Sequence, residues 1–489
     1  MRLAPGPASP VRLILLGLGL EAVYLAGFVL PYNLLVWLSR PAQDLASMGG
    51  TSPRSAAGYL ACVAALGVGA WLAYRESRRL PPRRATWIGF GFAGLFALTL
   101  VWAYPFDALD VFDYAMHGRM LAVLGANPYI ALPAWFPDDP FLPSVGWKTW
   151  PSVYGPVWTY LEGVIGWLSG DDLLRALLLL KGVAAASSLA CACAAYRIAR
   201  RWMPRQAPST IVLVAWNPLV VLMAGSGHNG LLMMALFLAG IWLIGEGRPA
   251  AGLWLAGVSA LIKPATVPLV VVLAVGEFCD QRRARRSVGR GVVVPLAVLL
   301  ATSGALYAPL WPGLDRLGPL LLQDLFSQSP LGLLRELWIP SLGEAGATEW
   351  AARLGQALLV LVVAGAMWRA RRGQWAAMQA VHDASFWIIF GALGWWQPWY
   401  VIWFATLAAI DHRPWMPGLS WVASLAGLVA LFDRFYLTQH WLAVDMLQHQ
   451  LHTVLLVFLP PIVWACMAPR LPSSAGWRPR QLPVARPSG

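Results

Sequence analysis

The stretch VRLILLGLGLEAVYLAGFVL, residues 11–30, decides the class of fold. Twenty such residues in a helix span the roughly 30 Å of hydrocarbon in a bilayer. Similar apolar runs recur along the chain, at 56–74, 87–104, 173–196, 209–224, 292–310 and 453–467. Inside a bilayer every backbone polar group must be satisfied within its own segment. We therefore predict an all-α polytopic membrane protein with about 13 to 15 transmembrane helices.

The composition agrees with this class. Of the 489 residues 58% are hydrophobic and only 12% are charged, whereas soluble domains carry about 25% charged residues. We expect one polytopic domain over 1–468 and a basic cytoplasmic tail over 469–489. The first apolar run is too long for a signal peptide and lacks a small-residue cleavage site, so we retain it as a helix. The five cysteines lie in apolar segments, which favours neither a disulfide framework nor a zinc site.

The net charge of +13 does not indicate nucleic acid, because of where the charges lie. Basic residues cluster in the short breaks between apolar runs, at 75–84, 197–205, 281–286 and 369–372. Cytoplasmic loops of membrane proteins carry such an excess of Lys and Arg. These loops are therefore predicted to face the cytoplasm, and the chain to contact membrane lipids and no nucleic acid.

Threading the chain from these loops places the unusual polar segments on the opposite side. The predicted external active-site loop is 105–151, and a second external segment is 311–350. The short clusters GSGHNG (225–230), IKPA (262–265) and WWQPWY (395–400) emerge on the same side. The run 154–168 is either a re-entrant or interfacial helix, which we favour, or a crossing that breaks the charge rule at 197–205.

The external loop begins with DALDVFDYAMHGRMLAVLGANPY, residues 107–129. In a helix Asp107, Asp110, Asp113, Tyr114 and His117 share a face about 120° wide. We expect a short amphipathic helix at the outer membrane surface, ended by the Asn127-Pro128 pair. This face is either a solvated surface or a catalytic one. Three close carboxylates repel, which raises the pKa of one of them and makes it a possible general base.

Two other external clusters allow two readings each. In GSGHNG, Asn229 could cap the following helix, or His228 and Asn229 could contact substrate oxygens. Lysine occurs only at 148, 181 and 263. Lys263 could extend to the interface as a long side chain at a helix end, or could hold a lipid-linked phosphate as a point charge.

The aromatic run WWQPWY is either an interfacial belt or the lining of a sugar or isoprenoid pocket. Its members Trp396, Gln397, Trp399 and Tyr400 are candidate substrate-lining residues. A further polar group of His440, Asp445, His449 and His452 lacks tight ligand spacing, so a wet surface is favoured there over a metal site.

The order of these motifs resembles a known family. DVFDYAMHGRM and GANPY are followed by YGPVW (154–158), NPLVV (217–221), GHNGLLM (227–233), Lys263-Pro264 and QPWYVIWF (397–404). Between about residues 90 and 410 the chain resembles GT-C class integral-membrane glycosyltransferases. It is most similar to the bacterial polyprenol-phosphate-mannose-dependent α-mannosyltransferases.

The resemblance implies an active site at the outer membrane face, where a lipid-phosphate sugar meets an acceptor hydroxyl. Asp110 matches the loop aspartate that acts as base, and Tyr114 the tyrosine after it. His228 and Asn229 match a His-Asn pair. The family often has Asp after that pair, where this chain has Gly230, so the resemblance leaves the acceptor open.

From these positions we predict an inverting transfer with Asp110 as base. Asp113 would tune Asp110 or hydrogen-bond the incoming sugar. Lys263, His228, Asn229 and Arg119 are predicted to bind the donor and its phosphate. Tyr114, His117 and Tyr154 would line the substrate site with the aromatic run. No nucleotide-binding motif is found; no cofactor is certain, although the carboxylates could hold a divalent cation.

We therefore predict that the protein, in the bacterial inner membrane, transfers a hexose from a polyprenyl-phosphate sugar to a glycan or glycolipid. Mannose is the favoured hexose. A flippase or transporter of a lipid-linked saccharide is the alternative, although it should place ionisable residues near the midplane. A non-catalytic scaffold leaves the external polar clusters unexplained.

Overall fold

The computed structural model describes residues 9–40, 44–313, 325–442 and 445–468. Within these ranges the chain is helical and forms no β-strand, only an isolated bridge between Asn33 and Ala103. The predicted all-α class is confirmed. The predicted tail, 469–489, and part of the predicted external segment 311–350 lie outside the described residues.

Eight helical segments are long and apolar enough to cross a membrane, so the chain is a multi-pass membrane protein. They are α1 with η1 (Pro10–Val29), α4 (Pro53–Ser77), α8 (Leu173–Trp202), η4 with α13 (Pro264–Arg283), η5, α14 and η6 (Gly289–Leu310), α15 (Pro330–Ala370), α18 with η11 (Met416–Trp441), and α19, η12 and α20 (Met446–Met467). The helices α9 (Ala207–Ala215) and α10 (Pro218–Gly225) meet at 52° and would form a ninth as one broken span.

This number is lower than the 13 to 15 spans predicted from the sequence. Among the described helices, α11 (Gly230–Gly245) and α12 (Pro249–Ala260) are apolar but short. At 1.5 Å per residue the 16 residues of α11 reach only about 24 Å. A further helix, α5 (Pro82–Leu100), begins with two arginines, Arg83 and Arg84. The difference between eight and the predicted number therefore lies in helices that are shorter or less apolar than a typical full crossing.

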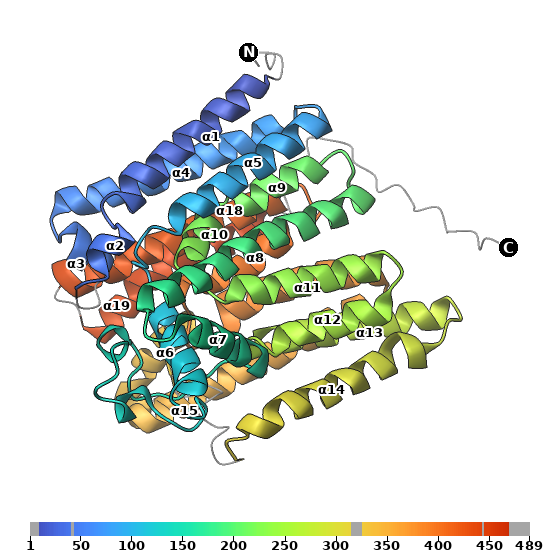
Figure 1. Ribbon diagram of the computed structural model, residues 1–489. Helices are drawn as coiled ribbons and strands as arrows, with labels where there is room; N and C mark the ends of the chain where they lie inside the picture. The colour runs from blue at the N-terminus through green and yellow to red at the C-terminus, as the bar shows by residue number, and fades with distance from the viewer. Residues whose placement is uncertain (1–8, 41–43, 314–324, 443–444, 469–489) are drawn as a thin grey trace.

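Shorter elements fill one end of the bundle and its interior. They include α2 (Leu34–Trp37), α3 (Leu45–Gly49), α6 (Asp110–Ala122), η2 (Pro133–Trp135), η3 (Leu142–Ser144), α7 (Pro156–Ser169), α16 (Gln374–Trp387), η9 (Ile388–Ala392), η10 (Pro398–Tyr400) and α17 (Val401–Ala408). The labels α2, α3, α6, α7 and α19 lie together on the left of Figure 1.

The long element α15 is a helical hairpin. Gly343 interrupts it with a φ of 68°, a left-handed conformation that glycine adopts readily. Arg335 Nε donates to Thr348 Oγ1 at 2.8 Å across the break. A Cβ placed on Gly355 would lie 2.8 Å from Leu331 Cδ1. The arm before Gly343 therefore folds back along the arm after it.

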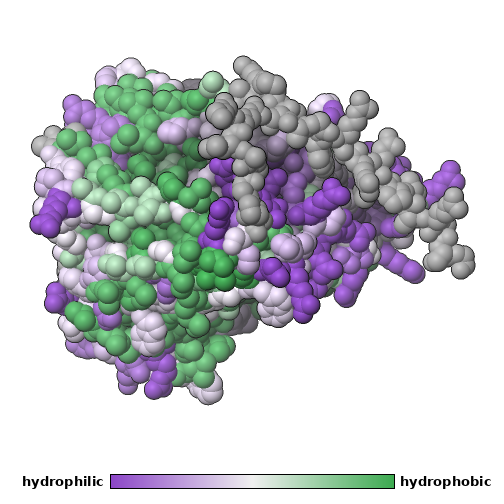
Figure 2. Space-filling view, turned by 90° about the horizontal axis from the view of Figure 1, so that it is seen from above, coloured by the Kyte–Doolittle hydropathy of each residue, from purple (hydrophilic) through white to green (hydrophobic). Residues whose placement is uncertain are grey.

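The predicted cytoplasmic loops gather at one end of the molecule, on the right of Figure 1. Arg283 donates to the carbonyl of Arg371, and the rings of Trp202 and Trp375 lie 5.2 Å apart. Figure 2 shows an apolar surface over the body, with hydrophilic residues most dense toward this end. The structure thus brings the basic loops to a single face, as the charge pattern predicts.

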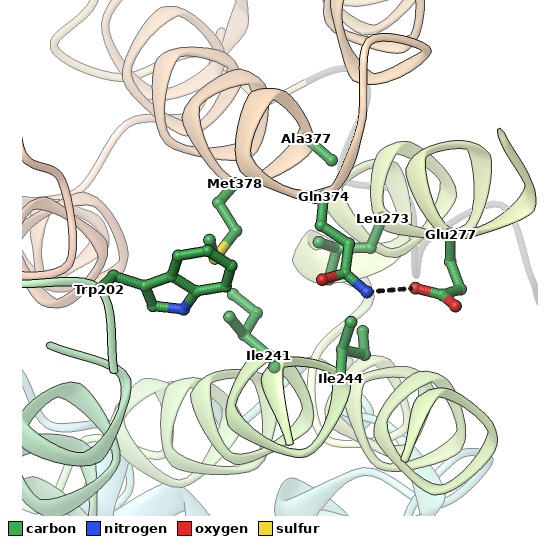
Figure 3. Close-up of a pocket in the computed structure, with 9 residues that line it drawn as sticks. Trp202, Ile241, Ile244, Leu273, Glu277, Gln374, Ala377 and Met378 are labelled. Atoms are coloured by element: carbon green, nitrogen blue, oxygen red, sulfur yellow. Dashed lines mark hydrogen bonds between the residues drawn. The ribbon is translucent and has the colours of Figure 1, made fainter. Parts of the chain in front are cut away.

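A small cavity lies at this basic end, between α8, α11, α13 and α16 (Figure 3). Its polar edge is Gln374, whose Nε2 donates to Glu277 Oε2 at 3.1 Å. The cavity holds about 10 Å³, the space of one water molecule. It is a small void where four helices pack together, and it is too small for a substrate.

The helix α6 differs from the prediction in its surroundings. It starts at Asp110 and ends at Ala122, so Asp107 precedes it, and every residue from Val111 to Met120 is buried. It packs against α7, and a Cβ on Gly118 would overlap the carbonyl oxygen of Glu162. The amphipathic surface helix is therefore a buried helix. With 14 residues, α7 is only about 21 Å long, too short to span a bilayer by itself.

Candidate active site

A cavity of about 820 Å³ opens at the end opposite the basic loops. Its wall includes parts of four segments that the sequence predicted on one side of the membrane, 105–151, 262–265, 311–350 and 395–400. Residues 434–439, which the sequence did not place on that side, complete the wall, and the predicted cluster 225–230 does not line it. Asp110, Asp113, His117, Tyr154, Lys263, Gln397, Trp399 and Tyr400 of the predicted site line it. The predicted convergence of distant polar clusters thus takes the form of one cavity.

Asp110 is the carboxylate of the predicted set that is best placed to meet a ligand. It is the first residue of α6 and is half-buried. Its Oδ2 lies 3.4 Å from the hydroxyl of Tyr114 and 3.3 Å from that of Tyr154, both possible donors. These long contacts hold one oxygen loosely, so the carboxylate can accept a proton from a bound hydroxyl.

Lys263 lies in a cage of aromatic rings beside this carboxylate. Its Nζ is 4.7 Å from the ring centre of Tyr400, 5.6 Å from that of Tyr154 and 5.5 Å from that of Trp403. Burial among the rings lowers the pKa of Lys263 to about 8, while the charge of Asp110 acts in the opposite direction. The cage presents a cation to the cavity without pairing it directly to a carboxylate.

Asp113 is hydrogen-bonded to the backbone of residues 146–147. Its Oδ1 accepts from the backbone N–H groups of Gly146 at 3.0 Å and Trp147 at 2.9 Å, and its Oδ2 is buried with no partner in the described part of the chain. Burial raises the pKa of Asp113 to about 8, against the two backbone hydrogen bonds. One oxygen thus holds the loop, and the other lies at the cavity wall.

His117 is buried one helical turn below Asp113. Neither of its ring nitrogens has a hydrogen-bond partner among the described residues. Burial lowers its pKa to about 4, so the ring is neutral at physiological pH. It lines the cavity floor as predicted, as a neutral imidazole.

His228 lies behind the cavity wall. Its Nε2 is 2.8 Å from Asp107 Oδ2, and its ring stacks on Trp399 at 4.7 Å and 21°. Neither His228 nor Asn229 lines the cavity, so the prediction that they bind donor phosphate does not fit this geometry. Asn229 precedes α11 without a side-chain capping bond, and its Nδ2 has no partner among the described residues.

Arg119 also lies away from the cavity. Its Nε donates to Asp139 Oδ2 at 2.6 Å, and its Nη1 donates to Asp171 Oδ1 at 2.6 Å and to the carbonyl of Gly170 at 2.8 Å. The guanidinium thus joins α6 to the external loop and to the turn after α7. The predicted phosphate contact is replaced by a structural one, because Arg119 is on the opposite face of α6 from Asp110.

The aromatic run needs one correction. Gln397, Trp399 and Tyr400 line the cavity, but Trp396 is fully buried in the core, 5.0 Å from the ring of Phe458. Its neighbour Trp395 lines the cavity instead and meets Trp147 of the external loop at 6.0 Å. Trp395 and Trp396, although adjacent, therefore point in opposite directions.

The sequence reading missed Arg434 and Asp44. Arg434 lines the cavity, is half-buried, and donates from Nη1 to Gln397 Oε1 at 3.4 Å. Asp44 lines the same arm of the cavity and caps α3 through the N–H of Ser47. The signal for Arg434 was an Asp-Arg pair inside an apolar run. Such intramembrane charges mark functional sites.

A second arm of the cavity is apolar. It runs between the start of α13, the α15 hairpin and η9, and is lined by Ala265, Pro268, Leu331, Ala351, Gly355, Leu359, Ile388 and Leu393. Small residues of α15 leave room beside the hairpin. The cavity therefore joins a charged arm to one that suits a hydrocarbon chain.

Among the residues that the structure describes, no cluster of three or more His, Cys, Asp or Glu side chains could hold a metal ion. The carboxylates of the cavity are dispersed instead: Asp107 pairs with His228, and Asp113 binds backbone N–H groups. This arrangement does not resemble the oxygen-ligand shells that hold Ca²⁺ or Mg²⁺.

Comparison with known proteins addresses the family. Residues 20–277, more than half of the chain, match the model of the alpha-(1->6)-mannopyranosyltransferase N-terminal domain. The chain is 27% identical over 183 residues to alpha-(1->6)-mannopyranosyltransferase A of Corynebacterium glutamicum, covering 37% of each protein. It is 27% identical over 199 residues to the protein of that name from Mycobacterium tuberculosis, covering 39% of this chain and 38% of that one.

A protein of Mycolicibacterium smegmatis named probable alpha-(1->6)-mannopyranosyltransferase is 32% identical over 162 residues, 32% of this chain and 29% of that one. The matches thus span less than two fifths of each relative's length. No solved structure matches the chain significantly. The family match confirms the resemblance seen in the motifs: the chain belongs to the alpha-(1->6)-mannopyranosyltransferase family.

Proposed function

We propose that the protein transfers mannose from a polyprenyl-phosphate donor to a hydroxyl of a glycan or glycolipid, as a GT-C class enzyme of the bacterial inner membrane. The observation that carries this proposal is the placing of Asp110 beside the caged cation Lys263 in one cavity. The family match and the names of the relatives support mannose as the sugar.

In the proposed reaction Asp110 takes the proton of the acceptor hydroxyl. The hydroxyl oxygen bonds to the anomeric carbon, and the bond from that carbon to the phosphate oxygen breaks with inversion. Polyprenyl phosphate leaves with the bonding electron pair. Lys263 and Arg434, which both line the cavity, are placed to stabilise the charge that grows on the phosphate.

The apolar arm supports a lipid-linked donor. A hydrocarbon chain between α13 and the α15 hairpin would leave its phosphate near Lys263, at the start of α13. The rest of the cavity, with Gln397 and Trp399, would hold the sugars. The basic loops at the other end favour an outer active site, since such loops usually face the cytoplasm.

The test compares the wild type with Asp110→Asn in detergent. Asp138 is the matched control, because it is an exposed carboxylate of the same external loop. Transfer from radiolabelled polyprenyl-phosphate mannose to a membrane-lipid extract is measured for both variants. We expect Asp110→Asn to lose about 10²- to 10⁴-fold in rate, as removal of a general base does, and Asp138→Asn to match the wild type.

Other outcomes separate the alternatives. Equal transfer by Asp110→Asn and the wild type would keep the enzyme class but move the base to Asp107 or Asp113. Binding of the donor without product in any extract would favour a flippase of lipid-linked saccharides over the transferase.

A further inference from the structure

The buried pair of Asp107 and His228 has no role in the proposed transfer. Both side chains are almost fully buried, at 1% and 2% exposure. His228 Nε2 lies 2.8 Å from Asp107 Oδ2, and Asp107 Oδ1 has no partner among the described residues. Asp107 reaches the cavity wall, whereas His228 stands one layer behind it. The pair therefore joins the wall to the interior of the bundle.

Trp399 connects the same histidine to the cavity by a second route. The imidazole covers one face of the indole, with ring centres 4.7 Å apart and an interplanar angle of 21°. Trp399 itself lines the cavity beside Gln397. Since one face is covered by His228, the rest of the indole is what a ligand meets, and its position depends on the imidazole.

The conformation of the turn before α11 places His228 beside Asp107 and Trp399. Gly227 has a φ of 82°, and a Cβ there would lie 2.8 Å from Val111 Cγ2 of α6. The N–H of His228 donates to the carbonyl of Met223 at 3.2 Å. Only a glycine fits the close approach of this turn to α6 without strain. Packing thus fixes the backbone of His228 relative to the first residues of the external loop.

A buried lysine lies near the pair of Asp107 and His228. Lys181 of α8 is fully buried, donates to the carbonyl of Ala103 and interacts electrostatically with Asp107. Asp107 is therefore hydrogen-bonded to the imidazole of His228 and lies in the electrostatic field of a buried lysine. The hydrogen bond limits the orientations of the carboxylate, so less conformational freedom is lost on binding.

We propose that His228 is a positioning residue, and that with Asp107 it sets the ring of Trp399 as the platform on which a pyranose ring of the substrate rests. A flat aromatic surface with a few fixed polar groups is typical of small-molecule sites. Asp107 and Trp399 contact the cavity directly, and His228 acts through them. The sugar as ligand rests on the proposed function, whereas the geometry of the pair does not.

The variants are His228→Gln, which can still donate a hydrogen bond to Asp107, and His228→Leu, which cannot. His382 provides the matched control at the basic end. It is 1% exposed, lies 3.4 Å from Asp411 Oδ2 and has its ring 4.7 Å from that of Phe404. His382→Leu removes a buried, carboxylate-paired imidazole that does not line the cavity.

Transfer kinetics with polyprenyl-phosphate mannose form the first arm. We expect His228→Leu, which loses both the donor to Asp107 and the stacked ring, to lose at least about tenfold in kcat/KM. His228→Gln, which keeps the donor but not the ring, should lose clearly less. His382→Leu should lower the thermal midpoint but not kcat/KM of the folded fraction. Equal losses in both His228 variants, or a fully active His228→Leu, would overturn the proposal.

The second arm does not depend on turnover. Histidine-labelled protein gives ring signals for seven histidines, and His228→Gln identifies the signal of His228. We expect Trp399→Leu and Asp107→Asn each to shift the His228 signal and to leave that of His382 unchanged. An unmoved His228 signal would refute the positioning. If the wild type transfers no mannose, the proposed function fails, while this arm still decides the geometry.

Discussion

The two ends of the molecule treat buried charge in opposite ways. At the basic end Arg413 donates to Asp383 Oδ1 and Asp411 Oδ2, each at 2.6 Å, and Arg369 donates to Asp383 Oδ2 at 2.6 Å. We call this set, with His382, the Arg413 cluster. At the cavity end Asp107 and Asp113 each keep one oxygen without a partner among the described residues.

Buried polar groups without partners destabilise a fold, so an excess of them needs an explanation. Apart from Nε2 of His382, the Arg413 cluster satisfies its members with each other. The cavity end leaves Lys263 among aromatic rings, and neither ring nitrogen of His117 has a partner within the ranges that the structure describes. The comparison teaches that the Arg413 cluster stabilises the bundle with a nearly complete network, whereas the cavity that we propose binds the substrate keeps incompletely paired polar groups in its wall.

Removing Arg413 should have the largest effect on stability. Arg413→Met leaves Asp383 and Asp411 buried without their shared cation, and breaking such a pair costs about 3–5 kcal/mol. The measurement is the free energy of unfolding in detergent, with kcat/KM of the folded fraction as the second readout. We expect a large loss in the first and no change in the second.

The control for this variant is Arg353→Met. Arg353 pairs with Glu349 at 2.6 Å, but both side chains are more than half exposed. Exposed pairs contribute about 0–1 kcal/mol. A loss in Arg413→Met no greater than in this control would contradict the division between the two ends.

Removing the charge of Lys263 should have the next largest effect, and on activity alone. Lys263→Met keeps a long side chain among Tyr154, Tyr400 and Trp403 but removes the cation from the cavity. Loss of one stabilising group at a developing charge costs about 10²- to 10³-fold. We expect that drop in kcat/KM with an unchanged thermal midpoint.

Lys148 offers the matched variant, because it lies on the exposed external loop. Lys148→Met should transfer mannose at the wild-type rate. If both lysine variants lose activity equally, the cage around Lys263 is not a phosphate site. The contrast between the Arg413 cluster and the cavity would then no longer include Lys263.

The sequence predicted the fold class and the members of the cavity better than their individual roles. Hydropathy and basic loops were sufficient to predict an all-α bundle and to place Asp110, Lys263 and Gln397 on one side. Hydropathy and loop charge can be read from each segment separately, without knowing how the segments pack. The direction of the Trp396 side chain depends on packing, which is why it was assigned to the site although it lies in the core. Arg119 points away from Asp110 by helix periodicity alone, and its ion pairs with Asp139 and Asp171 follow from that direction.

The surroundings of α6 also escaped the sequence. Its periodicity suggested a surface helix, but α7 and the loop at 146–147 cover it and bury its polar face. Arg434 was missed because it lies in a helix that otherwise reads as a plain apolar span. Both errors arise where tertiary contacts give a polar side chain an environment that composition does not encode.

The smallest effect concerns Asp113 and pH. Its pKa is raised to about 8 in the folded protein from an ordinary value of 3.8, so the folded state binds a proton that the unfolded chain has lost. Stability from this group is full at low pH and is lost as pH rises toward 8. His117, with a pKa of about 4, opposes this trend only below its ordinary value of 6.5.

Between about pH 6.5 and 8 the contribution of Asp113 is isolated by comparing the wild type with Asp113→Asn, because the titrations of His117 and Lys263 are common to both proteins. Asp113→Asn can still accept from Gly146 and Trp147 and carries no charge at any pH. We expect the thermal midpoint of the wild type to fall relative to that of Asp113→Asn across this window, by at most the linkage of one proton. Parallel curves would mean that Asp113 is ionised throughout, and the cavity would then hold one more fixed negative charge beside Asp110.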